Sequence, residues 1–168
     1  YKQNRVDNPD FDRTIFDYFK TTLATKYKLK LISSDHLEAD DIIALIHKQI
    51  TNKINTVIIT NDSDYVQLQN SNTIIVNMQL KDITIKHNIE NNTIYKALTG
   101  DKSDNIKRVG KITKVNAGNL IKKPVKEIYK WLEDNKLLNE FNNNMKLIDF
   151  NYIPENLANN LLSNINII

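Results

Sequence analysis

The spacing of hydrophobic residues along the chain alternates between the helical and the extended pattern. Apolar residues recur at helical spacing in residues 10–27 and again in 38–50, which predicts two helices. In the second helix, the residues expected to face a core are Ile42, Ile43, Leu45 and Ile46. Short β-branched runs predict strands at 28–33, 54–60, 72–77 and 82–86. The run at 54–60, INTVIIT, is nearly continuous, as in strands that are covered on both faces.

Two further short helices are expected between and after these strands, at 64–69 and 91–98. Alternating strands and helices predict an α/β fold with a parallel sheet and crossover helices. After Thr99 the strand pattern stops, and residues 113–163 are expected to form short helices with breaks at Pro124 and Pro154. The predicted domains are therefore an α/β core in residues 1–99 and a helical region in residues 100–168.

Acidic residues follow the predicted strands, where a parallel sheet gathers its ligands. They lie at the start of the helix after 28–33, directly after 54–60, and in the sequence TGDKSDN, and they are Glu38, Asp40, Asp41, Asp62, Asp64, Asp101 and Asp104. The strand ends share one edge, so we expect these carboxylates to converge, and so many could not all stay ionised without cations. Oxygen-rich sites select Mg²⁺ or Mn²⁺ rather than zinc.

Each acidic cluster also has a structural interpretation. Acids in the first turn of a helix favour its dipole and can cap it, with Ser34 or Asp35 as further capping candidates. The sequence NDSD at 61–64 is typical of a turn that caps the next helix, and GDKSDN is typical of a glycine-led turn. Independent turns have no reason to follow successive strands with paired acids, so the combination favours a metal site.

Composition narrows the class of protein. The 168 residues contain no cysteine, which excludes a disulfide framework, a thiolate zinc site and a cysteine nucleophile, and fits a reducing compartment. No apolar run approaches the length of a membrane span, and no signal peptide opens the chain. The chain begins at Tyr1 and ends in SNINII, so we expect it to be a piece of a longer protein.

The formal net charge is only +3, but its distribution matters more than the sum. If cations neutralise the seven acids of the predicted metal site, the other 13 acidic residues face 23 basic residues. Such a surface suits a polyanion.

Three motifs carry a family resemblance. LEADDIIALI, VIITNDSDYVQL and ALTGDKSDNI resemble, in order and spacing, the structure-specific 5′ nucleases, which include flap endonucleases and the 5′ nuclease domains of bacterial DNA polymerases. The stretch LIDFNYIPENLANNLL at 147–162 resembles the T-even bacteriophage ribonuclease H branch of that family. The resemblance implies a parallel-sheet, PIN-like nuclease core, a DNA-binding region of helix-hairpin-helix type, and two or more Mg²⁺ or Mn²⁺ ions on the seven acids.

The sequence YKQNR at the start resembles the family's opening of the helical arch, which would make residues 1–27 a remnant of that arch. The resemblance implies that Lys2 and Arg5 are catalytic residues that contact the scissile phosphate, and that Tyr1 stacks on a base. A frayed basic terminus is the alternative. Family members carry further metal-binding aspartates on strands before the arch, so we expect the site within this chain to be incomplete.

The hairpin that follows the last acidic motif diverges from the family pattern G-x-G-x-x-x-A. Lys111 and Thr113 stand where glycines would be, although Ala117 fits. The basic residues expected to hold the DNA backbone by charge instead are Lys107, Arg108, Lys111 and Lys114. A solvated basic face is the alternative.

The acidic site and the family resemblance together predict a divalent-metal-dependent 5′-3′ exonuclease or flap endonuclease that acts near 5′ ends of DNA or RNA–DNA hybrids, in primer removal during DNA replication. RNase H activity stays open, since the sequence does not decide between an RNA primer, a DNA flap and a nicked duplex as the substrate. By resemblance, its partners would include a sliding clamp and a single-strand-binding protein. We expect the protein to be a monomer, to be located in the cytoplasm and to have no membrane partner. His36, His47 and His87 are all expected to be structural or exposed, and modulation of the nearby acids is the alternative for His36.

Two other functions stay open at this point. The first is a non-catalytic DNA-junction binder, because an incomplete site need not hold metals in catalytic geometry. The second is a ribonuclease of the PIN class, which also gathers acids on a parallel sheet. The GDKSDN motif followed by basic helices argues against the PIN class.

Overall fold

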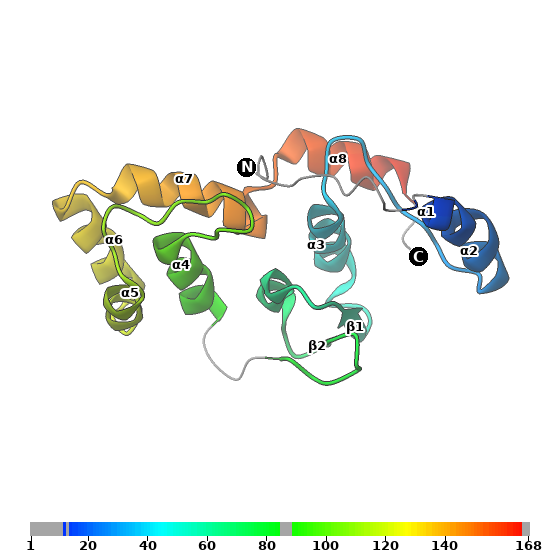
Figure 1. Ribbon diagram of the computed structural model, residues 1–168, viewed down its shortest axis with the longest axis horizontal. Helices are drawn as coiled ribbons and strands as arrows, with labels where there is room; N and C mark the ends of the chain where they lie inside the picture. The colour runs from blue at the N-terminus through cyan, green and yellow to red at the C-terminus, as the bar shows by residue number, and fades with distance from the viewer. Residues whose placement is uncertain (1–11, 13, 85–88, 166–168) are drawn as a thin grey trace.

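The computed structural model describes residues 12, 14–84 and 89–165. Helices dominate it, and a short sheet lies in the middle of the molecule (Figure 1). In chain order the elements are α1 (Thr14–Tyr18), η1 (Phe19–Leu23), α2 (Ala24–Lys26), α3 (Ala39–Ile50), β1 (Thr56–Ile59), η2 (Ser63–Leu68), β2 (Thr73–Val76), α4 (Ile89–Thr99), α5 (Lys114–Leu120), α6 (Val125–Asp134), α7 (Leu138–Ile148), η3 (Phe150–Tyr152) and α8 (Glu155–Asn164). The predicted helix at 10–27 corresponds to α1, α2 and the π-helical turn η1 between them.

The sheet consists of β1 and β2, which pair in parallel. Thr56 lies beside Thr73 and Ile59 beside Val76, and the 3-10 helix η2 lies on the connection between the strands. This arrangement confirms the predicted α/β fold with a parallel sheet. Of the possible strand at 82–86, the described part forms a single antiparallel bridge between Val76 and Asp82.

Two strand predictions and one core prediction are wrong. Residues 28–33 form no strand, because no neighbouring strand among the described residues supplies the ladder hydrogen bonds that an extended segment needs. β1 is not covered on both faces, since Val57 is 58% exposed and only Ile58 is buried. In α3, Ile42 and Leu45 are buried as expected, but Ile43 points outward and is 36% exposed.

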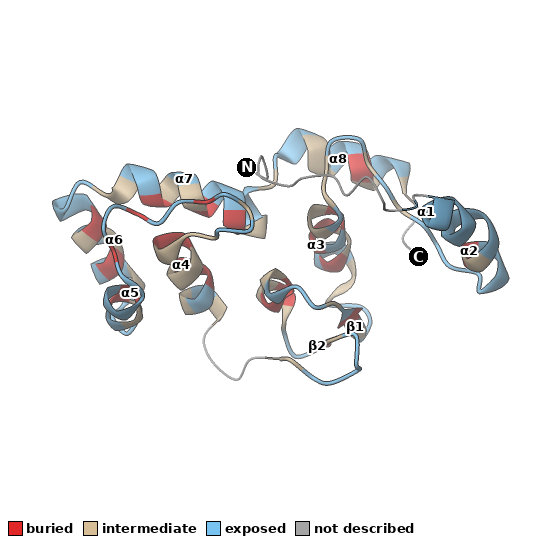
Figure 2. Ribbon diagram, in the orientation of Figure 1, coloured by how far each residue is buried: buried red, intermediate tan, exposed pale blue. Residues whose placement is uncertain are grey.

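The largest core lies between α4 and the three helices that follow it. The side chains at its centre are fully buried, and they include Leu98, Val109, Ile128, Leu132 and Phe141. Tyr129 packs edge-on against Phe141, with ring centroids 5.5 Å apart. Figure 2 shows buried residues on the inward faces of these helices. The predicted domain boundary at residue 99 separates α4 from these later helices, but α4 packs with them in one core. The boundary therefore stays a prediction.

Two smaller cores lie around α3. One joins α3 to the sheet and η2 through Ala44, Ile58, Tyr65 and Ile75. The other joins α3 to α8, where Leu161 packs against Ile42 and Leu45. The last helix therefore returns across the molecule and lies on α3 (Figure 1). No helix in the described ranges is long and apolar enough to cross a membrane.

Candidate active site

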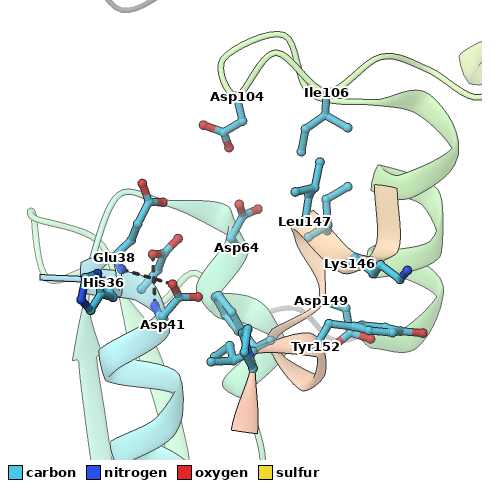
Figure 3. A pocket seen from close by; sticks show the side chains of 15 residues that line it. His36, Glu38, Asp41, Asp64, Asp104, Ile106, Lys146, Leu147, Asp149 and Tyr152 are labelled. Carbon is cyan, nitrogen blue, oxygen red and sulfur yellow. Dashed lines mark hydrogen bonds between the residues drawn. The ribbon is translucent and has the colours of Figure 1, made fainter. Parts of the chain in front are cut away.

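A pocket of about 350 Å³ brings five of the seven predicted acids together. They come from the start of α3, from η2 and from the loop after α4, and they are Glu38, Asp40, Asp41, Asp64 and Asp104. His36 lines the same pocket, as the sequence suggested (Figure 3). The three acidic motifs therefore meet in space although whole helices and strands separate them along the chain.

The first acidic cluster builds the start of α3. Glu38 is the N-cap residue, and its backbone N–H donates to Asp41 Oδ2 at 3.1 Å in a capping box. The backbone N–H of Asp41 donates to Asp40 Oδ1, also at 3.1 Å. The capping interpretation is thus confirmed for Glu38 and Asp41, whereas neither Ser34 nor Asp35 is the N-cap. The same contacts hold these carboxylates at the pocket.

The second cluster starts η2. Asp62 is its N-cap, and Asp62 Oδ1 accepts a hydrogen bond from the backbone N–H of Asp64 at 2.9 Å. Asp62 is exposed and lies outside the pocket lining, whereas Asp64 is largely covered and faces the pocket. The predicted capping turn is therefore also present here.

The third cluster lies in a tight turn after α4. The backbones of Asp101 and Ile106 exchange two hydrogen bonds, of 2.9 and 2.7 Å, which close the turn. The carboxylate of Asp101 accepts from the backbone N–H of Ser103 at 2.8 Å. Asp104, at the tip of the turn, reaches the pocket, whereas Asp101 lies outside its lining.

Lys96 of α4 connects the second and third clusters. Its Nζ forms ion pairs with Asp64 Oδ1 and with Asp101 Oδ2, the latter at 2.8 Å. Burial alone would lower the pKa of Lys96, but hydrogen bonds to Asp101 and Asp64 raise it above its ordinary value. This lysine was not predicted, because one cation on an amphipathic helix has the pattern of a solvated residue.

The pKa values report the negative potential of the site. Burial raises the pKa of Tyr65 to about 12, and the charges of Asp40, Asp62 and Asp41 add to the shift. Burial also raises the pKa of Asp64, against the opposing effect of Lys96. At Asp101, burial is outweighed by hydrogen bonds from Lys96 and Ser103, which lower the pKa to about 2. Four carboxylates thus act on one tyrosine, as convergence requires.

The all-carboxylate composition of this site suits a hard divalent cation, and Lys96 already places a positive charge between two of the carboxylates. As arranged, however, no group of three or more His, Cys, Asp or Glu side chains in the described part of the chain is placed to hold a metal ion. The metal role of the seven acids stays a prediction.

The wall opposite the acids comes from residues 146–154, at the end of α7 and in η3. In Figure 3, Leu147 and Ile106 lie beside Asp64 and Asp104, whereas the amine of Lys146 points away from them. The sequence offered no chemical reason to place this segment at the site. Its only signal was the phage-like resemblance of residues 147–162.

A second pocket, of about 770 Å³, lies at the turn after α4 and shares Ile106 with the acidic pocket. Three exposed cations line it, namely Lys102, Lys107 and Arg108. Lys102 was not predicted. Lys111 and Lys114, the other two basic residues predicted to hold the DNA backbone in place of the hairpin, are exposed but lie outside this pocket lining. Lys114 is the first residue of α5. The basic residues are therefore split between a pocket and a helix start.

Four predicted residues lie outside the described residues, namely Tyr1, Lys2, Arg5 and His87. His47 is buried, as expected for a structural histidine, and its Nε2 is hydrogen-bonded to Thr73 Oγ1 at 2.8 Å.

The chain belongs to the 5′ nuclease and flap endonuclease family. Residues 1–98 match the family model described as 5′-3′ exonuclease, N-terminal resolvase-like domain. The chain is 33% identical over 150 residues to DNA polymerase I of Caldicellulosiruptor bescii, a match that covers 79% of the chain and 18% of the polymerase. The chain thus spans less than a fifth of that relative. The family match favours a 5′ nuclease over a PIN-class ribonuclease.

Solved structures of a bacteriophage T5 enzyme share the fold. A T5 5′-exonuclease with bound zinc is 20% identical, with a TM-score of 0.68, over 90% of this chain and 69% of that one. The T5 flap endonuclease in a pseudo-enzyme-product complex with DNA and metal ions is 18% identical, with a TM-score of 0.64, over 90% and 67% of the two chains. At this identity the likeness establishes the fold alone.

Proposed function

We propose that this chain is part of a divalent-metal-dependent 5′-3′ exonuclease or flap endonuclease, which hydrolyses phosphodiesters near 5′ ends of DNA or RNA–DNA hybrids. The observation that carries the proposal is the single pocket lined by acids from three separate motifs, in a chain that belongs to the 5′ nuclease family. Primer removal during replication, with a sliding clamp and a single-strand-binding protein as partners, is the role we propose for the whole protein.

The residues that would hold the cations are the seven predicted acids. Bound divalent cations at such a site activate water and stabilise charge on the phosphate oxygens. The capping contacts of Glu38, Asp41 and Asp62 hold these three residues at the starts of α3 and η2. Lys2 and Arg5 remain our proposal for the cations that contact the scissile phosphate.

The nucleic acid would be held by charge rather than by base contacts. Lys102, Lys107 and Arg108 around the second pocket and Lys111 and Lys114 near the start of α5 suit backbone phosphates on one side of the acidic pocket. We propose that residues 100–168 form the DNA-binding region, of helix-hairpin-helix type, in which Lys111 and Thr113 replace the hairpin glycines.

The alternative, a non-catalytic DNA-junction binder, is favoured by one observation. The described acids are not arranged to hold a metal ion, and Lys96 already neutralises two of them in part. Such a protein would bind flap DNA without cleaving it.

The test compares Asp40→Asn, Asp62→Asn and Asp101→Asn in the full-length protein on 5′-labelled flap and RNA·DNA primer substrates. We expect each variant to lose Mg²⁺-dependent cleavage and to keep flap binding, because the basic surface is unchanged. The control is Asp134→Asn, an exposed acid at the end of α6, which should cleave like the wild type. Full cleavage activity in all three variants would contradict the assignment of these acids to a metal site. If the wild-type protein binds flap DNA but does not cleave it, the non-catalytic alternative is supported.

A further inference from the structure

Lys96 places a positively charged side chain among the carboxylates that are predicted to bind cations. Its ammonium group lies between carboxylates from two different motifs, Asp64 on η2 and Asp101 after α4. All three side chains are largely covered, with exposed fractions of 15–21%. This is not a mobile surface ion pair, since α4 and η2 pack against each other at this point.

The backbone fixes where the ammonium group can lie. Lys96 is in the last turn of α4, and its carbonyl accepts from the N–H of Gly100 at 2.9 Å, directly before the Asp101 turn. Asp64 is held at the start of η2 by its own N–H bond to Asp62. Lys96 and both carboxylates are therefore positioned by regular structure and by short turns.

An ammonium group and a divalent cation compete for the same carboxylate oxygens. The Lys96 amine lies 2.8 Å from Asp101 Oδ2, whereas a hard divalent cation binds such oxygens at about 2.0–2.6 Å. The two cations cannot both lie between Asp64 and Asp101. One ammonium also supplies one positive charge to a cluster that includes a third acid, Asp62, so the cluster stays negative overall.

We propose that Lys96 is a built-in competitor of the divalent cation: it pairs Asp64 with Asp101, and a metal ion that binds between these two carboxylates must displace it. This inference rests on the proposed function and adds a residue that sets metal affinity. Lys96 would thereby keep the negative site assembled before metal arrives. It would also weaken the binding of metal to a protein without substrate.

The test measures Mn²⁺ binding to the full-length protein without nucleic acid, by calorimetry and by the electron paramagnetic resonance signal of free Mn²⁺. Lys96→Met removes the charge while keeping side-chain length and helix propensity. Lys96→Arg keeps the charge. Lys146→Met is the matched control, because Lys146 lines the acidic pocket but its amine points away from Asp64 and Asp104 (Figure 3). Circular dichroism checks that each variant is folded.

We expect Lys96→Met to bind Mn²⁺ at least about tenfold more tightly than the wild type, since one nearby positive charge has been removed. Lys96→Arg and Lys146→Met should stay near the wild-type affinity. The melting temperature of Lys96→Met should be lower without metal and should rise more on adding Mn²⁺.

Unchanged or weaker Mn²⁺ binding by Lys96→Met would overturn the proposal, because a purely structural ion pair gives that result. In that case flap cleavage by the wild-type protein would still support the nuclease function. If neither the wild type nor any variant binds Mn²⁺, the competitor role and the metal-dependent function both fail.

Discussion

At the scale of single residues, Gly100 decides the geometry of the third acidic motif. Its φ angle is +72°, in the left-handed region that residues other than glycine rarely adopt. A Cβ atom at this position would lie 2.5 Å from the carbonyl oxygen of Ile106 and 2.6 Å from the backbone nitrogen of Arg108. These are backbone atoms, so they cannot rotate away. The position of Asp101 and the shape of the second pocket both depend on this close approach of Gly100 to the backbone of residues 106–108.

We therefore expect Gly100→Ala to lower the free energy of unfolding by about 1–3 kcal/mol, the range for strained backbone positions. Gly118→Ala is the matched control, because Gly118 lies inside α5 and a Cβ atom there would meet no neighbouring group within 4 Å. That change should stabilise the protein by about 0.5–1 kcal/mol through helix propensity. Denaturant unfolding of both variants measures the difference, and equal effects would contradict the close approach.

At the scale of secondary-structure elements, helices were more predictable than strands. The period of α3 and the prolines before α6 and α8 mark helices that depend mostly on local sequence. A strand depends on partners elsewhere, which is why residues 28–33 look extended in sequence but do not pair within the described residues. The exposed face of β1 has the same cause, since periodicity cannot say whether a layer covers it.

Convergence was predicted from strand ends, but of the three acidic motifs only Asp62 and Asp64 follow a strand in the structure, since residues 28–33 form no strand and Asp101 follows α4. Three acidic motifs placed after successive elements were sufficient to expect convergence, and five of their acids share one pocket. Lys96 was not predictable, because its partner Asp64 is 32 residues away in sequence. The wall at 146–154 was missed for the same reason, as it arrives through the packing of α7 and η3.

The start of α5 gives a prediction for nucleic-acid binding. If Lys111 and Lys114 neutralise phosphates there, duplex affinity falls as salt rises, and replacing both by alanine should make the logarithmic slope shallower by up to about 1.8. The effect should be equal for different duplex sequences, because phosphate contacts carry no base information. Lys48→Ala with Lys53→Ala, near the end of α3 away from the acids, is the control and should leave the slope unchanged. If the double alanine replacement leaves the salt slope unchanged, Lys111 and Lys114 belong to a solvated basic face and do not contact phosphates.

At the scale of the whole molecule, a buried histidine ties α3 to the sheet. His47 is 6% exposed and hydrogen-bonded to Thr73 of β2, and burial lowers its pKa below the ordinary 6.5. The unfolded chain therefore takes up the proton first as the pH falls. The contribution of His47 to stability is complete above pH 6.5 and is lost as the pH falls from there toward the lower pKa of the folded state.

We expect the wild type to lose more unfolding free energy between about pH 7.5 and pH 5.5 than His47→Gln, which has no group that titrates in this range at residue 47. Urea unfolding at both pH values measures the difference. Equal losses in the wild type and His47→Gln would show that the buried imidazole does not set the pH dependence.

The return of α8 onto α3 has a consequence for the order in which the protein is made. Leu161 packs against Ile42 and Leu45, which lie far earlier in the chain. Contacts of such long sequence separation raise contact order and form late, because a large loop must close first. On the ribosome, the helix that carries the first acids therefore completes its packing only after the last helix has emerged. Until then its apolar face is open to other nascent chains and to chaperones.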